Sequence, residues 1–442
     1  MRTPRRNDAR HSSGPTTRSA NPNDRPAGAS FRPTPSGGRR AERGERPAHA
    51  PDRPPRNPWG RPAGNGAGQA PLTQAEGILD QDARSYYYVR TRADWVPCPA
   101  DLFVPPALIE RAGLRVGHQI TVTARPPRAG DRFSSVADVL RIEGRESDAR
   151  TWQQFERLTA VSPHRRLRLE VSRDEFTTRA IDLLAPMGRG TRGLIVAPPF
   201  AGKTRLLSAI ARALATNYPE LKIFVVLIDE RPEEVTEFRR LGVGNVVASS
   251  FDSGAESHLQ LAELVLHRAQ RLVEIGEDVV FLVDSLTRLA RTSNLDSKGT
   301  GRTLSGGLDA AALRFPRKLL GAARCTEEGG SLTILATTLV DTGSRMDDHI
   351  YEEFKGTGNW ELHLSRALAE RRIFPAIDVP ATGTRREELL YTPEELSAVT
   401  KLRRHLQVNA GGQEQMALLL KWLEQTKDNS HLLAAAERLV DK

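Results

Sequence analysis

A Gly-Lys-Thr triplet at residues 202–204 is the first place in this chain where side chains could do chemistry. A short apolar run, residues 194–196, precedes it across a loop that contains Pro and Gly, and apolar residues at helical spacing follow it. Strand, loop and helix in this order form a phosphate cradle, in which backbone N–H groups face the anion, Lys203 adds a positive charge and the Thr204 hydroxyl can bind Mg²⁺. A chance triplet at a turn is the alternative, but the flanking pattern is the one the motif requires. The stretch therefore predicts a nucleoside triphosphate site.

Charged residues at the ends of two other apolar runs could complete this site. Asp284 follows residues 279–283 and could bind the Mg²⁺ that bridges the β- and γ-phosphates. Glu230 closely follows residues 223–228, where it could polarise the attacking water, and Arg231 beside it could contact phosphate. The alternatives are an ordinary strand-end cap for Asp284 and solvated surface charge for the Asp-Glu-Arg triplet.

The elements that must position these groups alternate between strand and helix from residue 152 onward. Predicted strands lie at residues 194–196, 223–228, 245–249, 279–283 and 332–336, and predicted helices follow at 203–217, 232–240 and about 259–273. Apolar strands separated by helices predict a mostly parallel sheet covered on both faces, with ligands at the carboxyl ends of its strands. Thr337 and Thr338 follow the last of these strands and could sense the γ-phosphate. A capping box at residues 392–395 starts a further helix, and two amphipathic helices follow Gly412.

Residues 76–151 have a different pattern, in which short β-like runs are separated by Pro and Gly turns. Their number and length predict a small five-stranded barrel of the OB type, with a few helical residues at 107–112. In a strand, Tyr86, Tyr88 and Arg90 share one face, while Tyr87 points into the core. Aromatic rings beside Arg favour stacking of single-stranded bases, although the tyrosines could instead fill the barrel. Arg125, Arg128 and Arg132 could follow a nucleic-acid backbone.

The first 70 residues carry the whole excess of positive charge. They contain 14 Arg, no Lys, 5 acidic residues, 12 Pro and 9 Gly, whereas the other residues hold 50 basic and 50 acidic groups. Such a segment cannot bury enough apolar surface to offset its ordering entropy, so we expect a disordered tail that attracts phosphate backbones or only solubilises the chain.

The rest of the composition narrows the class of protein. Two distant cysteines, Cys98 and Cys325, predict neither a disulfide framework nor a metal-binding cluster, and fit a reducing cytosol. The Arg-rich N-terminus lacks the apolar segment of a secretory signal, and no apolar run approaches the ~20 residues that span a bilayer.

Two polar loops are further candidates for nucleic-acid contact. One is the Gly-rich basic loop at 297–307, which includes Arg302, and the other lies at 341–345 and ends at Arg345. Either loop could equally be a plain connector.

Several long motifs carry a family resemblance. Asp-Glu-Arg-Pro-Glu-Glu-Val at 229–235 and Glu-Glu-Phe-Lys-Gly-Thr-Gly-Asn at 352–359 are more specific than a shared nucleotide fold requires. Together with residues 193–204, 282–291 and 374–378, they resemble the bacterial transcription termination factor Rho, and the similarity runs from about residue 76 to the end.

The resemblance implies an architecture and an activity. The fold would be an α/β RecA-like P-loop motor domain with C-terminal helices at 152–442, preceded by an OB/cold-shock-like RNA-binding barrel at 76–151 and a disordered tail at 1–75. The activity would be that of a cytoplasmic homohexamer that uses ATP and Mg²⁺ to pull single-stranded RNA through a central pore in the 5′→3′ direction. Its partners would be that RNA and the RNA polymerase elongation complex, with no membrane involved.

The resemblance also carries roles onto individual residues. Lys203 and Thr204 would bind phosphate and Mg²⁺, Asp284 would bind Mg²⁺, Glu230 would be the catalytic base, and Arg385 with Arg372 would complete the neighbouring subunit's site. Further candidate nucleotide-binding residues are Gly188, Arg189, Gly190, Thr191, Arg192, Gly193, Phe200, Ala201, Gly202, Arg205, Arg231 and Phe374. RNA-binding candidates are Tyr86, Tyr88, Arg90, Asp101, Phe103, Arg132 and Phe133 in the barrel, with Arg302 and Arg345 in the pore loops.

Two departures from the family pattern motivate an alternative function. Phe200 stands where the family usually has Lys, and Arg205 replaces an apolar residue that usually flanks adenine. The alternative is a Rho-like ring that binds RNA and hydrolyses ATP weakly or not at all. A rotary-ATPase-like or recombinase-like relative is a third interpretation, against which the aromatic barrel and the long motifs argue.

Overall fold

The computed structural model describes residues 72–127, 131–146, 149–250, 254–296, 305–412 and 414–439. The Arg-rich segment up to residue 71, the candidate cations Arg128 and Arg302, and most of the loop at 297–307 lie outside the described residues.

The first described domain is a closed barrel of five strands in the order β1-β2-β3-β5-β4. Its strands are β1 (Thr73–Gln81), β2 (Tyr87–Arg90), β3 (Leu102–Val104), β4 (Gln119–Arg125) and β5 (Ser135–Ile142), with the helix α1 (Pro106–Ala112) between β3 and β4. The predicted five-stranded barrel is therefore confirmed. Its first strand begins inside the segment predicted as tail. Gly77 in that strand is required by packing, because a Cβ there would lie 2.3 Å from the backbone oxygen of Arg90.

The second domain is built on a nine-stranded, mostly parallel sheet, as predicted. The main path runs β11-β10-β12-β14-β9-β15-β16, and β13 and β6 lie off it. The bounds of these strands are β6 (Ala160–Val161), β9 (Arg192–Ala197), β10 (Lys222–Glu230), β11 (Asn245–Ser250), β12 (Asp278–Asp284), β13 (Arg324–Thr326), β14 (Ser331–Leu339), β15 (Trp360–His363) and β16 (Gly383–Thr384). A separate pair, β7 (Arg166–Leu167) and β8 (Met187–Gly188), joins the segment that precedes β9.

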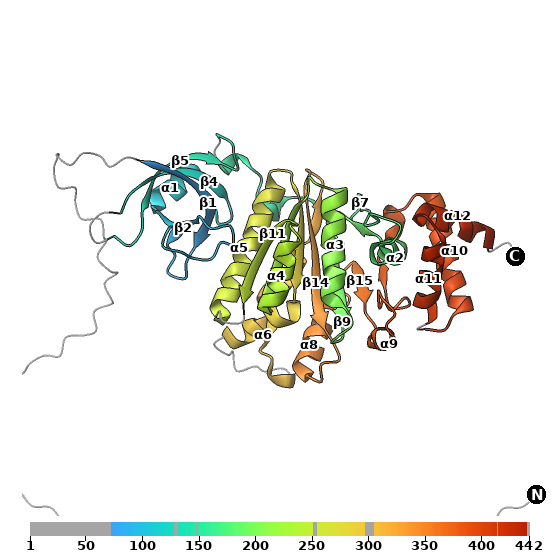
Figure 1. Ribbon diagram of the computed structural model, residues 1–442. Helices are drawn as coiled ribbons and strands as arrows, with labels where there is room; N and C mark the ends of the chain where they lie inside the picture. Colours follow the sequence, from blue (N-terminus) through green and yellow to red (C-terminus); the bar gives the residue numbers. More distant parts are fainter. Residues whose placement is uncertain are drawn as a thin grey trace, which may run out of the picture. The chain divides into compact units, whose positions relative to one another are not determined.

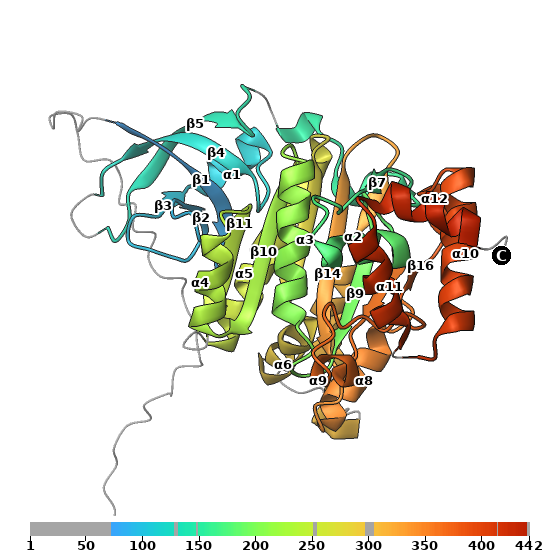
Figure 2. The same ribbon diagram turned by 45° about the vertical axis from the view of Figure 1, so that its right-hand side comes forward.

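Helices cover both faces of this sheet (Figures 1 and 2). Successive strand residues point to opposite faces, so neighbouring residues of one strand belong to two different cores. Ile195 and Ala197 of β9 belong to the core beneath α2 (Phe176–Leu184), α3 (Lys203–Asn217) and α4 (Pro232–Arg240). Leu194 and Val196 belong to the opposite core, beneath α5 (Ala255–Glu274), α6 (Leu286–Asp296), α7 (Arg314–Gly321) and α8 (Arg345–Phe354). The short helix α9 (Arg366–Glu370) follows β15.

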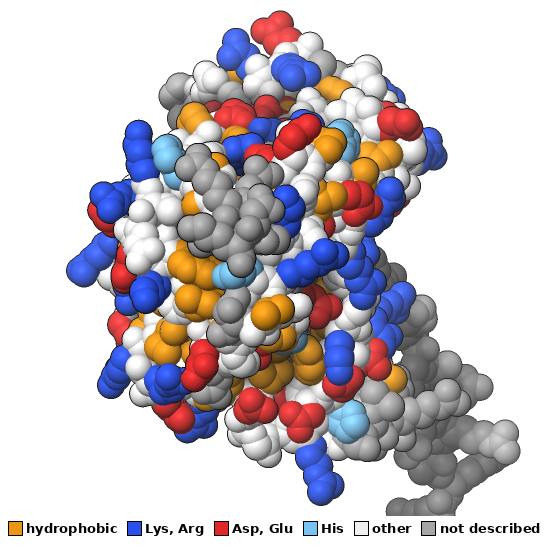
Figure 3. All heavy atoms as spheres, turned by 90° about the vertical axis from the view of Figure 1, so that its right-hand side faces the viewer, with side chains coloured by type: hydrophobic (Ala, Val, Ile, Leu, Met, Phe, Trp, Pro, Cys, Tyr) orange, Lys and Arg blue, Asp and Glu red, His pale blue; other side chains and the backbone are white. Residues whose placement is uncertain are grey.

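Three C-terminal helices pack on the face that carries α2. They are α10 (Pro393–Asn409), α11 (Glu414–Gln425) and α12 (Asn429–Leu439), and the predicted capping box of Thr392 and Glu395 starts α10. The fully buried Arg179 of α2 fixes them, since its guanidinium donates to the Leu423 carbonyl at 2.9 Å and to Asn429 Oδ1 at 3.2 Å. Acidic and basic side chains are interspersed on this face of the molecule (Figure 3).

Helix α5 also contacts the barrel through buried ion pairs. Arg268 binds the Glu143 carboxylate at 2.6 Å, and Glu274 accepts from both Arg115 and Arg271. Separating α5 from the barrel would leave buried charges without their partners, so these ion pairs hold α5 against the barrel. Among the described residues, no helix has the length and apolar character needed to cross a membrane.

Candidate functional site

The phosphate cradle is formed where β9 ends and α3 begins. Residues 198–202 turn the chain, and Gly202 takes a left-handed φ of 89° directly before Lys203. Because the N-terminus of α3 has no side-chain cap, its first N–H groups are available to an anion. Glycine is favoured at residue 202 by this backbone conformation, and a Cβ there would stand in ordinary contact with the ring of Phe374, at 3.6 Å.

Lys203 lies between the two carboxylates that the sequence predicts at this edge of the sheet. Its Nζ is 2.5 Å from Asp284 Oδ1 and 3.2 Å from Glu230 Oε1, and both carboxylates are about 1 % exposed. Burial alone would lower the pKa of Lys203, but the two carboxylates outweigh burial and raise it. Burial, together with the negative charge of Asp284, raises the pKa of Glu230. The structure thus brings Lys203, Glu230 and Asp284 into one buried cluster beside the cradle.

Two threonines add hydroxyl oxygens to this cluster. Thr204 donates to Glu234 Oε2 at 3.0 Å, and Thr337 donates to Asp284 Oδ1 at 2.7 Å. Thr338 is buried on the neighbouring position of β14, and its hydroxyl makes no hydrogen bond. Thr204 and Asp284 supply one hydroxyl and one carboxylate oxygen, which fits Mg²⁺ because this ion takes few protein ligands and shares the rest with phosphate. Within the described ranges, no group of three His, Cys, Asp or Glu side chains could hold a metal by itself.

One arginine that the sequence did not single out belongs to the same cluster. Arg288, on the first turns of α6, places Nε 3.2 Å from Glu230 Oε1 and donates to the backbone oxygen of Asp229. Its only signal in the sequence is its position four residues after Asp284. Arg231 lies at the N-cap of α4 and is exposed at the same edge.

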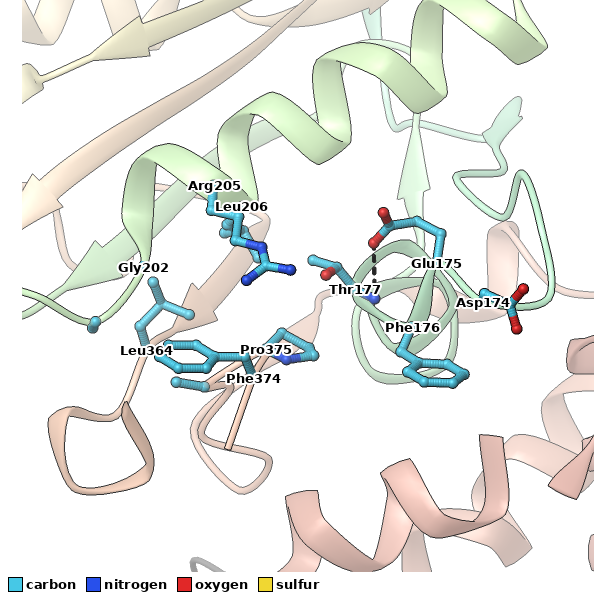
Figure 4. Close-up of a pocket in the computed structure, with 12 residues that line it drawn as sticks. Asp174, Glu175, Phe176, Thr177, Gly202, Arg205, Leu206, Leu364, Phe374 and Pro375 are labelled. Atoms are coloured by element: carbon cyan, nitrogen blue, oxygen red, sulfur yellow. Dashed lines mark hydrogen bonds between the residues drawn. The ribbon is translucent and has the colours of Figure 1, made fainter. Parts of the chain in front are cut away.

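A small cavity of about 110 Å³ opens beside the cradle, with Phe374 on its wall (Figure 4). Its lining comes from the start of α2, the start of α3 and the segment that follows α9, and it includes Ala201, Gly202 and Arg205. The guanidinium of Arg205 points toward Phe374 and Pro375 (Figure 4). Phe200, by contrast, has a φ of 65° and is 92 % exposed. The departure at residue 200 therefore removes a charge from the loop without placing a ring in the cavity.

One group of predicted nucleotide-binding residues lies away from the cradle of its own chain. These residues lie before β9 or at its first residue, at the end of the strand opposite to the cradle; they are Gly188, Arg189, Gly190, Thr191 and Arg192. Arg189 is bound there to Asp278 and Glu220, and a Cβ at Gly190 would lie 2.2 Å from the backbone of Cys325. These residues are close to the phosphate loop in sequence, but the full length of β9 separates them from it in space. Gly193, in the same strand, is packed against Leu335 and Trp360.

The two predicted arginine fingers are exposed, and Arg385 lies apart from the Lys203 cluster. The backbone N–H of Arg385 donates to Asn359, which in turn donates to Arg192 at the first residue of β9. The cradle follows the last residue of that strand, about 16 Å farther along. Arg385 therefore cannot reach the cradle of its own chain. Arg372 precedes Phe374 by two residues and has a φ of 61°.

The barrel presents the predicted group of aromatic rings on one face. Tyr88 is central, with its ring centroid 6.0 Å from that of Phe103 and 5.4 Å from that of Phe133, both edge to face. Tyr86 lies 6.2 Å from Phe103 and is 39 % exposed, and Arg132 lies over the Phe133 ring at 5.3 Å. Tyr87 packs against the barrel core, as predicted. We call Tyr86, Tyr88, Phe103 and Phe133 the aromatic platform.

Arg90 and Asp101, which are both predicted to bind RNA, form a buried ion pair with each other. Arg90 is 7 % exposed and donates to Asp80 at 2.7 Å and to Asp101 at 2.8 Å, while Asp101 is 1 % exposed. The guanidinium carbon of Arg90 lies 5.5 Å from the Tyr88 ring centroid. Both residues thus support the aromatic platform from beneath.

Arg345 begins a helix in the structure, whereas the sequence predicted a loop that ends at this residue. It is the first residue of α8, exposed, and follows a turn at residues 341–344. With Arg291, Asn294, Leu295 and Gly306 it lines an open cavity of about 510 Å³. Arg291 is held by Asp347, which also accepts from Thr342 at 2.6 Å, so α6 and this turn are connected.

We expect Tyr88→Ala to weaken the binding of pyrimidine-rich single-stranded RNA by roughly tenfold to a hundredfold, since one base stack contributes about 1–3 kcal/mol. Fluorescence anisotropy with labelled RNA at fixed salt measures this change. Tyr351→Ala, a change to a half-buried tyrosine of α8, is the matched control and should leave RNA affinity on the barrel unchanged. Equal RNA affinity of wild type and Tyr88→Ala would contradict the stacking role.

Comparisons with known proteins support both domains. The family model of the Rho termination factor RNA-binding domain matches residues 75–148, and that of the ATP synthase alpha/beta family nucleotide-binding domain matches residues 177–382. The chain is 52% identical over 359 residues to the transcription termination factor Rho of Streptomyces coelicolor, covering 81% of this chain and 85% of that protein. It is 48% identical over 368 residues to that of Escherichia coli K12, covering 82% and 88%. It spans about half, 52%, of the length of a third such relative, from Streptomyces lividans, at 49% identity over 83% of this chain.

Solved structures show the same nucleotide-binding fold at lower identity. An ATPase of the type III secretion system of pathogenic bacteria superposes with a TM-score of 0.53 at 24% identity, covering 64% of this chain and 86% of that chain. The assembled ATPase of the enteropathogenic Escherichia coli type III secretion system gives a TM-score of 0.51 at 24% identity, covering 64% and 73%. These similarities concern the fold of the nucleotide-binding domain.

Proposed function

Because the chain belongs to the transcription termination factor Rho family, we propose that it is an RNA-stimulated ATP hydrolase that terminates transcription by pulling nascent RNA through a ring of six subunits. The observation that carries this proposal is the coexistence of the Lys203, Glu230 and Asp284 cluster with the aromatic platform of the barrel. One domain offers a nucleotide site and the other a surface for unpaired bases.

At the nucleotide site, each group of the cluster has a distinct task. The first N–H groups of α3 and Lys203 bind the β- and γ-phosphates, whose negative charge replaces the carboxylates as the partner of Lys203. Thr204 and Asp284 would hold Mg²⁺, which would neutralise charge on the phosphates. Glu230 accepts a proton from the attacking water, and burial favours this step because the raised pKa makes its carboxylate a stronger base. Arg288 keeps Glu230 in position.

The position of Arg385 supports assembly of several copies. Its backbone is fixed at the end of β9 that is remote from the cradle of its own chain, so it can complete only the site of a neighbouring subunit. A closed ring gives every site such a neighbour. Arg345 would then line the central pore and contact the RNA backbone.

The aromatic platform supports single-stranded RNA as the ligand of the barrel. Stacking on rings tolerates any base, and Arg132 beside Phe133 adds a charge for the backbone. The partner of this activity would be the RNA polymerase elongation complex, and the compartment would be the cytoplasm.

Release of transcripts from halted elongation complexes tests the proposed function. We expect addition of the protein with ATP and Mg²⁺ to release RNA, and the non-hydrolysable analogue AMP-PNP to give no release. Release that is equal with either nucleotide would favour the alternative function, a Rho-like ring that binds RNA without using hydrolysis.

A further inference from the structure

The turn of the phosphate cradle carries a large apolar side chain that points into solvent. Phe200 is 92 % exposed, the highest value among the large apolar side chains of the described residues. Its φ of 65° lies in the left-handed region, which a bulky residue adopts only where the surrounding turn imposes it. Single exposed apolar side chains are common on protein surfaces, so this exposure gains meaning from its place. That place is the rim of the cradle, three residues before Lys203.

The residue expected to complete a neighbour's cradle lies beside an exposed turn. Arg385 is held at the far end of β9 from its own cradle, where its backbone N–H donates to Asn359. Its guanidinium lies against the turn at 355–357, because a Cβ at Gly356 would stand 3.5 Å from Nη2. Lys355, Gly356 and Thr357 of this turn are all exposed. The turn therefore accompanies the guanidinium of Arg385 to the surface that this guanidinium contacts.

The reach of Arg385 brings this turn close to Phe200 of the next subunit. In the proposed ring, the guanidinium of Arg385 contacts the terminal phosphate that Lys203 of the neighbouring subunit binds. Gly356 lies within contact distance of that guanidinium. Phe200 precedes Lys203 by three residues, which span at most about 11 Å. Phe200 of one copy and Gly356 of the next copy therefore both lie close to the same phosphate.

We propose that Phe200 is a contact between copies of this chain, in which its ring packs on the turn at 355–357 of the neighbouring subunit. The inference rests on the ring of subunits in the proposed function and specifies one of its contacts. The turn suits an aromatic ring, because Gly356 exposes its backbone and the Lys355 ammonium already lies over an aromatic ring, that of Tyr351, at 5.7 Å. A Lys at residue 200 would instead meet the like charge of Lys355.

Cross-linking of two different variants tests the contact itself. Phe200→Cys and Thr357→Cys chains are mixed in equal amounts, assembled with AMP-PNP, Mg²⁺ and single-stranded RNA, and treated with a short bis-maleimide. A cross-linked dimer on a denaturing gel is expected from the mixture and from neither variant alone, since the bridge needs one cysteine from each copy. Val408→Cys mixed with Thr357→Cys is the matched control and should give no dimer, because Val408 is 84 % exposed but lies on α10.

The stability of the assembly tests whether the contact contributes to it. Mass photometry on dilution measures the subunit concentration at which half of the rings have dissociated. We expect Phe200→Ala to raise this concentration by roughly tenfold, since it removes the buried area of an aromatic side chain. Phe200→Tyr, which keeps the ring of the side chain, and Val408→Ala, which truncates an apolar side chain elsewhere, should both stay within about twofold of wild type.

Two results would overturn the proposal: no dimer from Phe200→Cys with Thr357→Cys in an assembled sample, or unchanged dissociation of Phe200→Ala. Weaker AMP-PNP binding by Phe200→Ala with unchanged dissociation would show that Phe200 acts inside its own cradle. A wild-type chain that does not assemble under these conditions would instead remove the proposed ring of subunits.

Discussion

Glu230→Gln is expected to lower RNA-stimulated ATP hydrolysis by two to four orders of magnitude, because the amide cannot take a proton from the attacking water. The substitution keeps the size of the side chain and can still accept hydrogen bonds from Lys203 and Arg288, which lie 3.2 Å away. Binding of AMP-PNP should therefore persist. Release of inorganic phosphate, followed with saturating RNA, measures the loss.

The matched control is Glu233→Gln, which changes an exposed carboxylate on the first turn of α4. It removes the same charge three residues away without touching the cluster, so hydrolysis should stay within about twofold of wild type. A Glu230→Gln protein that hydrolyses ATP at the wild-type rate would exclude Glu230 as the base.

Arg385→Ala should abolish most of the hydrolysis while each chain still binds nucleotide in its own cradle. An arginine supplied in trans stabilises charge that develops on the transferred phosphoryl group, and its loss costs on the order of 10³-fold in kcat or more. Since Arg385 lies at the far end of β9 from its own cradle, the affinity for AMP-PNP should change much less than kcat.

Arg386→Ala is the control for this variant. Arg386 is also exposed, but its guanidinium is bound to Ser162 and approaches Glu388 within its own chain. Near-normal phosphate release is expected from it. If Arg385→Ala were fully active, or if it lost AMP-PNP binding in proportion to activity, a trans role would be ruled out.

The sheet and the cradle could be predicted from the sequence because their signals are local. β10 and β12 are continuous apolar runs with a carboxylate at or near the end, and Gly202 with Lys203 is a strand-to-helix turn. Continuous apolar runs of this length are typical of parallel strands that are buried on both faces of a sheet. β1 is harder to predict, because polar residues interrupt it and its place depends on Gly77 fitting against Arg90.

The surroundings of the candidate residues that the sequence could not predict depend on contacts between distant residues. Arg90 has the charge expected of an RNA ligand, but Asp101, eleven residues away, binds it inside the barrel. Arg189 precedes the phosphate loop closely in sequence, yet the extended strand between them places it at the other edge of the sheet with Asp278. Arg288 joins the cluster only because α6 begins beside Glu230.

The rate of ATP hydrolysis with and without pyrimidine-rich single-stranded RNA tests the central claim most directly. If the two domains act as one motor, RNA should raise phosphate release by at least tenfold, and Tyr88→Ala should require a higher RNA concentration to reach the same rate. ATP hydrolysis that stays at the same low level with saturating RNA would contradict the motor account and leave a ring that only binds RNA.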